Sequence, residues 1–351
     1  MGKEIMRRAK LYGVAAVLLA ILLVSVCYQF GYIPQVSIPS TSAMPTFGSY
    51  GELYDYLKKD SQSRGWYPYS DSSGNVVIFM SPGMRTLGPE GVAQDLGFSN
   101  FASSYSKVQH SATNIQVSGV DEADVVKVDD YGYIYKITGN NITILKAYPP
   151  GEAEIVSILT FTDMTPVGIF VNADRLAVLG TQYSMVQPPY LDVPFRWNYF
   201  TDVSTYAKIY DISNRSQPEL MKYYNVSGSY FNSRMIGEYV YFVSSTPAFY
   251  TLEIFPSITV DKVNLPKIDS NGNSREVSAT EVHYSNTTDN GTDGYYNYNL
   301  FTTIAAMNIQ NVTEELTYKT IMTGGASSIY VSLHNIYIAY PSADKTSIYR
   351  I

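Results

Sequence analysis

The chain has 351 residues, which is long enough for one large domain with appended segments, and 45% of them are hydrophobic while 16% are charged. This composition excludes an intrinsically disordered protein, and the 33 tyrosines favour β-strands over helices. The formal net charge of −7, with no basic stripe, disfavours nucleic acid as a partner.

The N-terminus predicts a membrane anchor. Residues 1–10 form a basic tail, and residues 11–33 are an uncharged, largely apolar run that is long enough to span a bilayer as a helix. The basic side chains of Arg7, Arg8 and Lys10 favour a cytoplasmic N-terminus. We therefore expect a single-pass protein of the cell membrane, bound to the lipid bilayer through residues 11–33, with an extracellular body. A cleaved signal peptide is the alternative.

The segment that follows predicts little regular structure. Residues 34–47 contain prolines among Ser and Thr, as is typical of an extended linker. Residues 48–112 predict a mixed helical and irregular segment. Its first part, 49–63, has apolar side chains at helical spacing after a Ser that can cap a helix. A second helix is expected near "EGVAQDLGF", residues 90–98.

An acidic stretch opens the part of the chain that is rich in β-forming residues. The sequence "SGVDEADVVKVDDYGYIYKI", residues 118–137, places five carboxylates before a strand pattern. Asp129 and Asp130 fit a hairpin turn. Asp121, Glu122 and Asp124 do not fit the spacing of a calcium loop, but they leave a structural cation site as one interpretation. The other interpretation is that they bond to backbone amides or basic side chains; no cofactor is predicted.

Degenerate repeats follow from about residue 113. The stretches 168–180, 233–245 and 327–340 share a plan of strand, short polar turn and strand. A second pair of strands follows each of the first two after a variable gap, at 207–224 and 302–321. Each unit therefore has four strands, which is typical of the blades of a β-propeller.

The repeats predict an all-β fold over residues 113–351. Blades are expected to start near residues 125, 166, 228 and 325, with insertions at 181–204 and 246–300 between their second and third strands. The fourth unit ends in its third strand, so the sequence predicts three full blades and part of a fourth. Either the chain is an incomplete fragment of a larger propeller, or another copy completes the sheet as a homo-oligomer.

The stretch "TNIQVSGVDEADVVKVDDYGYIYKI" with the following "ILKAYPP" resembles a family of archaeal and bacterial secreted proteins. Members of that family have a C-terminal β-propeller domain distantly related to WD repeats. The resemblance extends over roughly residues 45–351 and is most specific at 113–150. It implies an export or anchor segment and an external propeller, and it implies no activity, because the family has no assigned function. The Trp-Asp dipeptide of true WD repeats is absent here.

Two further features suggest surfaces on the outside of the cell. The first insertion carries aromatic side chains that could bind a protein or a glycan, or pack the loop onto the propeller face: Tyr183, Tyr190, Phe195, Trp197 and Tyr199. Six sequons are candidates for N-glycosylation: Asn141, Asn214, Asn225, Asn286, Asn290 and Asn311. The second insertion is polar and rich in Gly and Asn over residues 269–299, so we expect that part to be solvated.

These patterns predict a binding or assembly module of the cell envelope, with a protein or glycan ligand at the propeller face. The alternative is an envelope hydrolase or lyase that acts on glycans through carboxylates on the insertion face. The sequence contains no G-x-S-x-G, P-loop or G-x-G-x-x-G motif, which leaves enzymatic activity without a motif to support it. No residue is predicted to be catalytic.

Overall fold

A computed structural model describes residues 44–63, 117–186, 200–254, 258–284, 300–323, 328–342 and 345–351. The predicted tail, membrane anchor and most of the linker lie outside these residues, as does the helix expected at 90–98. Among the described residues, no helix is long and apolar enough to cross a membrane.

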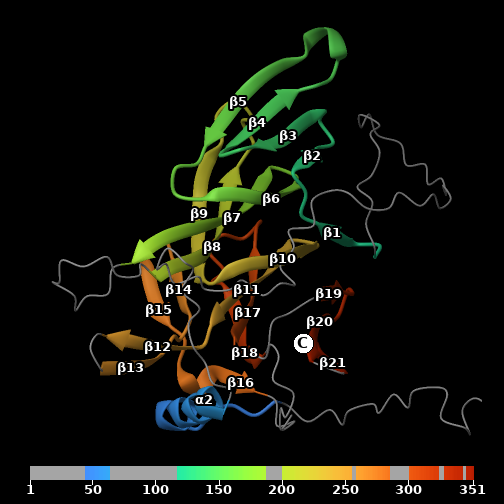
Figure 1. The fold of residues 1–351 in the computed structure, drawn as a ribbon. Helices are drawn as coiled ribbons and strands as arrows, with labels where there is room; N and C mark the ends of the chain where they lie inside the picture. The colour runs from blue at the N-terminus through green and yellow to red at the C-terminus, as the bar shows by residue number, and fades with distance from the viewer. Residues whose placement is uncertain are drawn as a thin grey trace, which may run out of the picture. The chain divides into compact units, whose positions relative to one another are not determined.

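The described part is built mostly from strands, which confirms the all-β fold class. Four sheets repeat the same antiparallel order, and we call them blades 1 to 4 (Figure 1). Blade 1 consists of β2 (Val126–Val128), β3 (Tyr133–Thr138), β4 (Asn141–Lys146) and β5 (Glu154–Thr160). Blade 2 consists of β6 (Thr165–Asn172), β7 (Arg175–Val186), β8 (Phe200–Asp211) and β9 (Glu219–Ser227).

The other two blades follow the same plan. Blade 3 consists of β10 (Ser229–Ile236), β11 (Tyr239–Pro247), β17 (Leu300–Asn308) and β18 (Thr317–Thr323). Blade 4 has three strands, β19 (Ser328–Val331), β20 (Ile336–Ser342) and β21 (Lys345–Arg350). The first strands begin at residues 126, 165, 229 and 328, close to the starts expected from the repeats. None of the sheets closes on itself.

Side chains between neighbouring blades form the core. Leu176, Ala177, Val178 and Leu179 in β7 are all wholly buried, because blade 2 is covered on both faces. Leu176 and Val178 pack in one core with residues of blade 1, whereas Ala177 and Leu179 pack in another with residues of blade 3. A third core lies between blades 3 and 4 and includes Val243.

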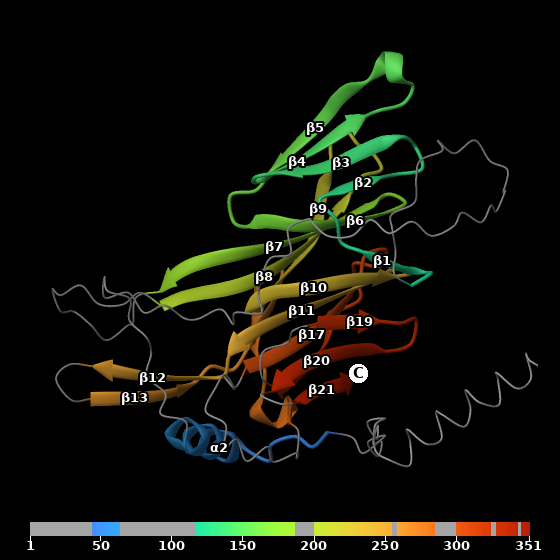
Figure 2. The same cartoon turned by 45° about the vertical axis from the view of Figure 1, so that its right-hand side comes forward.

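The insertions contain more regular structure than the sequence suggested. In the first, β7 extends to Val186 and β8 starts at Phe200, so only residues 187–199 lie between the strands. In the second, the structure adds these elements: β12 (Phe249–Ile254), β13 (Ile258–Val263), β14 (Lys267–Ser270), β15 (Asn273–Glu276), η2 (Ala279–Glu281) and β16 (Val282–Tyr284). Figure 2 shows β12 and β13 as a hairpin of their own.

The segment 269–299, which was expected to be solvated, is exposed at all four residues of β15, but its first half also has regular structure and buries Val277, Ala279 and Val282. Strand β14 pairs with β9, which adds the β14–β15 hairpin to the outer edge of blade 2. Strand β16 pairs in parallel with β18 at the outer edge of blade 3. A polar sequence can occupy these positions because an edge strand is held by backbone hydrogen bonds and keeps one side in water.

One helix packs against this second insertion. Helix α2 (Tyr50–Ser63) begins as expected, because the Ser49 hydroxyl accepts a hydrogen bond from Glu52 N–H at 3.1 Å. Its apolar side chains Leu53 and Leu57, one turn apart, are buried in the core between blades 2 and 3. Just before the helix, Phe47 stacks on Tyr284 with ring centroids 4.3 Å apart.

The remaining elements are short. Strand β1 (Val120–Glu122) pairs with β10 at the inner edge of blade 3. A 3-10 helix, η1 (Pro150–Glu152), connects β4 to β5.

Candidate functional site

The predicted acid cluster does not form one site. Asp121 accepts a hydrogen bond from Lys127 Nζ at 2.7 Å, and Glu122 pairs with Arg234 at 3.2 Å. Asp124 instead accepts from the backbone N–H of Val125 at 2.6 Å. The described residues contain no group of three or more His, Cys, Asp or Glu that could hold a metal ion. The structure therefore places the three acids in the second arrangement considered above, on basic side chains and backbone.

These acids belong to residues 117–124, a segment that contacts both blade 3 and blade 2 and which we call the crossing segment. Strand β1 within it pairs with β10 of blade 3. Asp124 then exchanges two backbone hydrogen bonds, of 2.9 and 3.4 Å, with Ile169 in β6 of blade 2. A Cβ on Gly168 would lie 2.8 Å from Ala123 Cβ, so only glycine allows this approach without a shift. The crossing segment thus ties blades 2 and 3 together before blade 1 begins.

A buried ion pair links blade 1 to blade 2. Arg215 lies in the turn after β8 and donates to Asp129 Oδ2 from Nε at 3.2 Å and from an Nη at 3.1 Å. The side chains of Arg215 and Asp129 are 9% and 4% exposed. The hydroxyl of Tyr135 also donates to Asp129, at 2.9 Å, and burial followed by the Asp129 charge raises the pKa of Tyr135 well above its usual value.

The hydrogen bonds of Asp129 support the prediction that it lies in a hairpin turn. Its Oδ1 accepts from the backbone N–H groups of Tyr131 and Tyr133, both at 2.9 Å. Its Oδ2 accepts hydrogen bonds from Arg215, which is 86 residues away in the sequence. No sequence pattern near Asp129 predicts Arg215 as its partner.

The next junction repeats this contact with different residues. Gln310, in the turn after β17 of blade 3, donates to the carbonyl of Asn172 at 2.9 Å. Asn172 occupies the hairpin of blade 2 where Asp129 lies in blade 1, and it donates in turn to Gly237 of blade 3 at 2.9 Å. A turn that follows the third strand therefore reaches the first hairpin of the preceding blade at both junctions.

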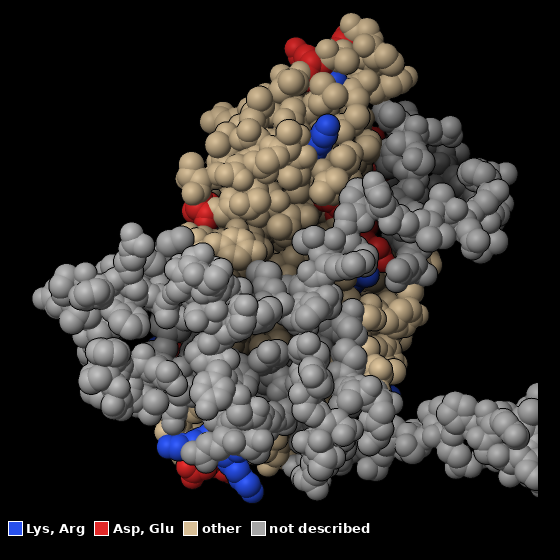
Figure 3. Space-filling model, in the orientation of Figure 1, with Lys and Arg blue, Asp and Glu red and all other residues tan. Residues whose placement is uncertain are grey.

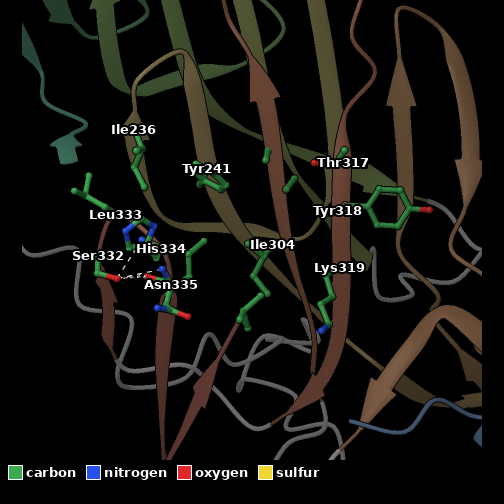
Figure 4. Close-up of a pocket in the computed structure, with 14 residues that line it drawn as sticks. Ile236, Tyr241, Ile304, Thr317, Tyr318, Lys319, Ser332, Leu333, His334 and Asn335 are labelled. Atoms are coloured by element: carbon green, nitrogen blue, oxygen red, sulfur yellow. Dashed lines mark hydrogen bonds between the residues drawn. The ribbon is translucent and has the colours of Figure 1, made fainter. Parts of the chain in front are cut away.

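The junction between blades 3 and 4 contains an open cavity of about 310 Å³. Its lining includes Ile236, Tyr241, Ile304, Lys319, His334, Ile336 and Ile351. Figure 4 shows the hairpin turn from Ser332 to Asn335 on one side of it, and the Lys319 side chain on the opposite side of β18 from the Tyr318 ring. Among the described residues, the lining includes no Asp or Glu. It is an apolar cavity with a few polar groups, the usual composition of a binding site.

The predicted aromatic and sequon residues are only partly within the described residues. Tyr183 lies in β7 and is 58% exposed, whereas Tyr190, Phe195, Trp197 and Tyr199 lie outside the described residues. Asn214 and Asn311 are exposed in turns, and Asn141 and Asn225 are partly buried in strands. Asn225 is paired on both sides, with Tyr206 in β8 and Asp269 in β14. Asn286 and Asn290 lie outside the described residues.

Comparison with known families identifies the fold. The family described as the beta propeller domain matches residues 110–351. The chain belongs to this family. The match covers all four blades and the crossing segment, and it agrees with the resemblance found in the sequence.

Two curated relatives have no assigned function. An uncharacterized protein of Archaeoglobus fulgidus is 21% identical over 343 residues, which is 93% of this chain and 47% of that protein. An uncharacterized protein of Methanocaldococcus jannaschii is 28% identical over 145 residues, 41% of this chain and 19% of that protein. The chain spans less than half the length of each of these relatives. No solved structure matches the chain significantly.

Proposed function

We propose that this β-propeller is a binding or assembly module of the cell envelope, anchored by residues 11–33 with its body outside the cell. The family supports a module of this kind, because propellers present their blades and loops to other molecules. The apolar run next to basic residues supports the anchor. The observation that carries the binding role is the apolar surface left free on blades 1 and 4.

Blade 4 presents one uncovered face. Tyr330 and Ile348 are 49% and 64% exposed. The strand registers place Tyr330, Tyr337 and Ile348 on the same side of the sheet, with the two tyrosine rings 6.0 Å apart. The opposite side, which includes Ile338 and Ile351, packs on blade 3.

Blade 1 presents a second uncovered face. Val126, Ile155 and Ile158 are 39%, 60% and 55% exposed, and their registers place them on the side of the sheet away from blade 2. Figure 3 shows few charged side chains on the visible surface of blade 1. Exposed apolar side chains gathered on a sheet are typical of a protein contact.

We infer that the partner is a protein with an apolar sheet face, and that a second copy of this chain is the first partner to test. The blade 4 face of one copy would cover the blade 1 face of the next, which is a heterologous contact that can close into a ring. Each contact would extend the row of stacked sheets already seen between blades 1 and 4.

The experiment is the mass of the purified full chain in detergent, measured by light scattering after size exclusion. The expected result is a defined oligomer that Ile348→Lys and Ile155→Lys each disperse. Leu220→Lys is the matched control, because Leu220 is also apolar and 49% exposed but lies on blade 2. A monomer, or an oligomer that all three variants leave intact, would contradict self-assembly through these faces.

The anchor and the outward orientation need their own test. Full-length protein is expected in the membrane fraction after alkaline extraction, and a chain starting at residue 34 in the soluble fraction. Protease added to intact cells should digest the body. Survival of the body until the cells are lysed would contradict the proposed orientation. We also propose glycans at Asn214 and Asn311, which mass spectrometry of the peptides would reveal.

The alternative of a glycan hydrolase or lyase has less support. That chemistry needs two carboxylates roughly 5–10 Å apart in one cleft. The described residues that line the cavity include no carboxylate, and Asp121, Glu122 and Asp129 are each engaged by a basic side chain.

A further inference from the structure

A short turn motif closes two of the three junctions between blades. In blade 2, β8 ends at Asp211 and Ile212 follows; in blade 3, β17 ends at Asn308 and Ile309 follows. The positions are equivalent, because Asp211 pairs with Arg175 and Asn308 pairs with Tyr239, the first residues of β7 and β11.

Both isoleucines fill the space between blades. Ile212 is wholly buried in the core between blades 1 and 2, and Ile309 is wholly buried in the core between blades 2 and 3. Their backbone N–H groups donate to the backbone carbonyls of Asp174 and Glu238, both at 2.9 Å. Burying such a side chain contributes roughly 2 kcal/mol.

The preceding Asp or Asn shapes the turn. Asp211 Oδ1 accepts from Ser213 N–H at 2.7 Å, and Asn308 Oδ1 accepts from Gln310 N–H at 3.0 Å. A side chain that bonds to the backbone two residues later stabilises a turn at that point. The motif is therefore Asp or Asn followed by Ile, and each residue has a separate role.

The junction between blades 3 and 4 has no such isoleucine among the described residues. In blade 4, Ile336 and Ile351 exchange backbone hydrogen bonds of 3.0 and 2.8 Å, and Ser332 closes the hairpin with Asn335. This register puts Ile351 at the position of Tyr210 and Met307, one residue before the motif. None of the described residues of blade 4 therefore occupies the two motif positions.

The open cavity lies where the isoleucine of the motif would lie at the junction between blades 3 and 4. Tyr241, Ile304 and Lys319 of its lining are equivalent in register to Ala177, Ala207 and Tyr224 of blade 2. All three of those blade 2 residues pack in the core that contains Ile309. The cavity is also continuous with an existing interface, because Ile304 and Ile336 belong both to its lining and to the core between blades 3 and 4.

Lys319 offers a polar contact to a turn that fills the cavity. At the equivalent position in blade 2, the Tyr224 hydroxyl donates to the carbonyl of Glu314, which follows the turn of blade 3. Lys319 would place an ammonium group where that hydroxyl lies, and it can donate to a carbonyl in the same way.

We propose that this cavity binds a polypeptide turn in which Asp or Asn is followed by Ile, carried by a partner polypeptide and leading into a strand along β21. The ligand is a partner segment of the repeat's own type, with the isoleucine in the cavity. This inference goes beyond the proposed function, because the cavity is separate from the two free faces.

The test appends a copy of residues 211–227, DISNRSQPELMKYYNVS, directly after Ile351 of the full chain in detergent. Hydrogen exchange of the β21 amides is compared with that of the unextended chain. We expect exchange to slow by about 10-fold or more, because the new strand pairs with β21 and the isoleucine fills the cavity. In a matched tail, the isoleucine is replaced by Asp, and the protection should be lost.

A second measurement does not depend on the extended chain folding as expected. A fluorescent peptide with the sequence of residues 308–323 should bind the unextended chain, and Lys319→Met should weaken that binding. Equal protection by the Ile and Asp tails would overturn the inference, and so would failure of both tail and peptide. Neither result would change the oligomeric state measured for the unmodified chain or for Ile348→Lys, so the two proposals can fail separately.

Discussion

Replacing Arg215 by Ala tests whether the turn after the third strand holds neighbouring blades together. The substitution removes two donors from Asp129, whose side chain is 4% exposed, and one from Asp174, which is 47% exposed. Removing one partner of a buried ion pair costs about 3–5 kcal/mol, whereas an exposed pair contributes less than about 1 kcal/mol. Asp129 keeps three hydrogen bonds, so we expect a loss near the lower limit, about 3 kcal/mol.

Urea unfolding of Arg215→Ala at neutral pH measures this loss directly. Arg275→Ala is the control, because Arg275 and Glu281 also form an ion pair but are 56% and 42% exposed, and we expect it to cost less than about 1 kcal/mol. A double variant that adds Asp129→Asn should cost less than the two single variants together, because it removes the unpaired buried charge. If Arg215→Ala costs no more than Arg275→Ala, the ion pair does not hold the junction.

Three further expectations follow from the packing. Ile212→Ala should lower the free energy of unfolding by about 2–5 kcal/mol, whereas Ile155→Ala, at an exposed position, should change it by less than about 0.5 kcal/mol; equal losses would refute the role of the turn isoleucine. Gly168→Ala should destabilise by about 1–3 kcal/mol in thermal melts, with partial rescue by Ala123→Gly, and no rescue would mean that the close approach is not the cause. Burial raises the pKa of Tyr340 to about 12, so its contribution to stability is complete below about pH 10 and falls by about 2 kcal/mol as the pH rises to 12; melts of Tyr340→Phe should show a weaker alkaline loss than the wild type.

The blades could be predicted from the sequence because the two strands of each hairpin are neighbours in the chain. The stretch 168–180 alternates between two buried faces and turns at Ala173, whose φ is +51°, so composition and spacing alone locate β6 and β7. Helix α2 was equally local, since its cap and apolar spacing lie within 15 residues. Segments whose structure depends on partners far away in the sequence could not be predicted in this way.

The second insertion shows that limit. Strand β14 exists because the backbone of β9 lies free at the edge of blade 2, and nothing in "KIDS" identifies that partner. The partners of the acid cluster were equally hidden, because Glu122 and Arg234 are brought together only when β1 pairs with β10. The sequence located the acidic segment, and the structure assigned its side chains.

The cavity had no sequence signal of its own. Its lining comes from separate strands of blades 3 and 4 and becomes recognisable only by comparison with the equivalent positions in blade 2. The one available signal was the repeated Asp-Ile and Asn-Ile pair at 211–212 and 308–309, which aligns once the strand registers are known.

The most direct test of the binding role is hydroxyl-radical labelling of Tyr330, in the purified chain and in its Ile155→Lys variant. Tyr50 serves as the reference, since it is 52% exposed on helix α2 while Tyr330 is 49% exposed on blade 4. If a second copy covers the blade 4 face, Tyr330 should be protected in the purified chain and labelled in the dispersed variant, with Tyr50 labelled in both. Equal labelling of Tyr330 in the two proteins would contradict a role in assembly.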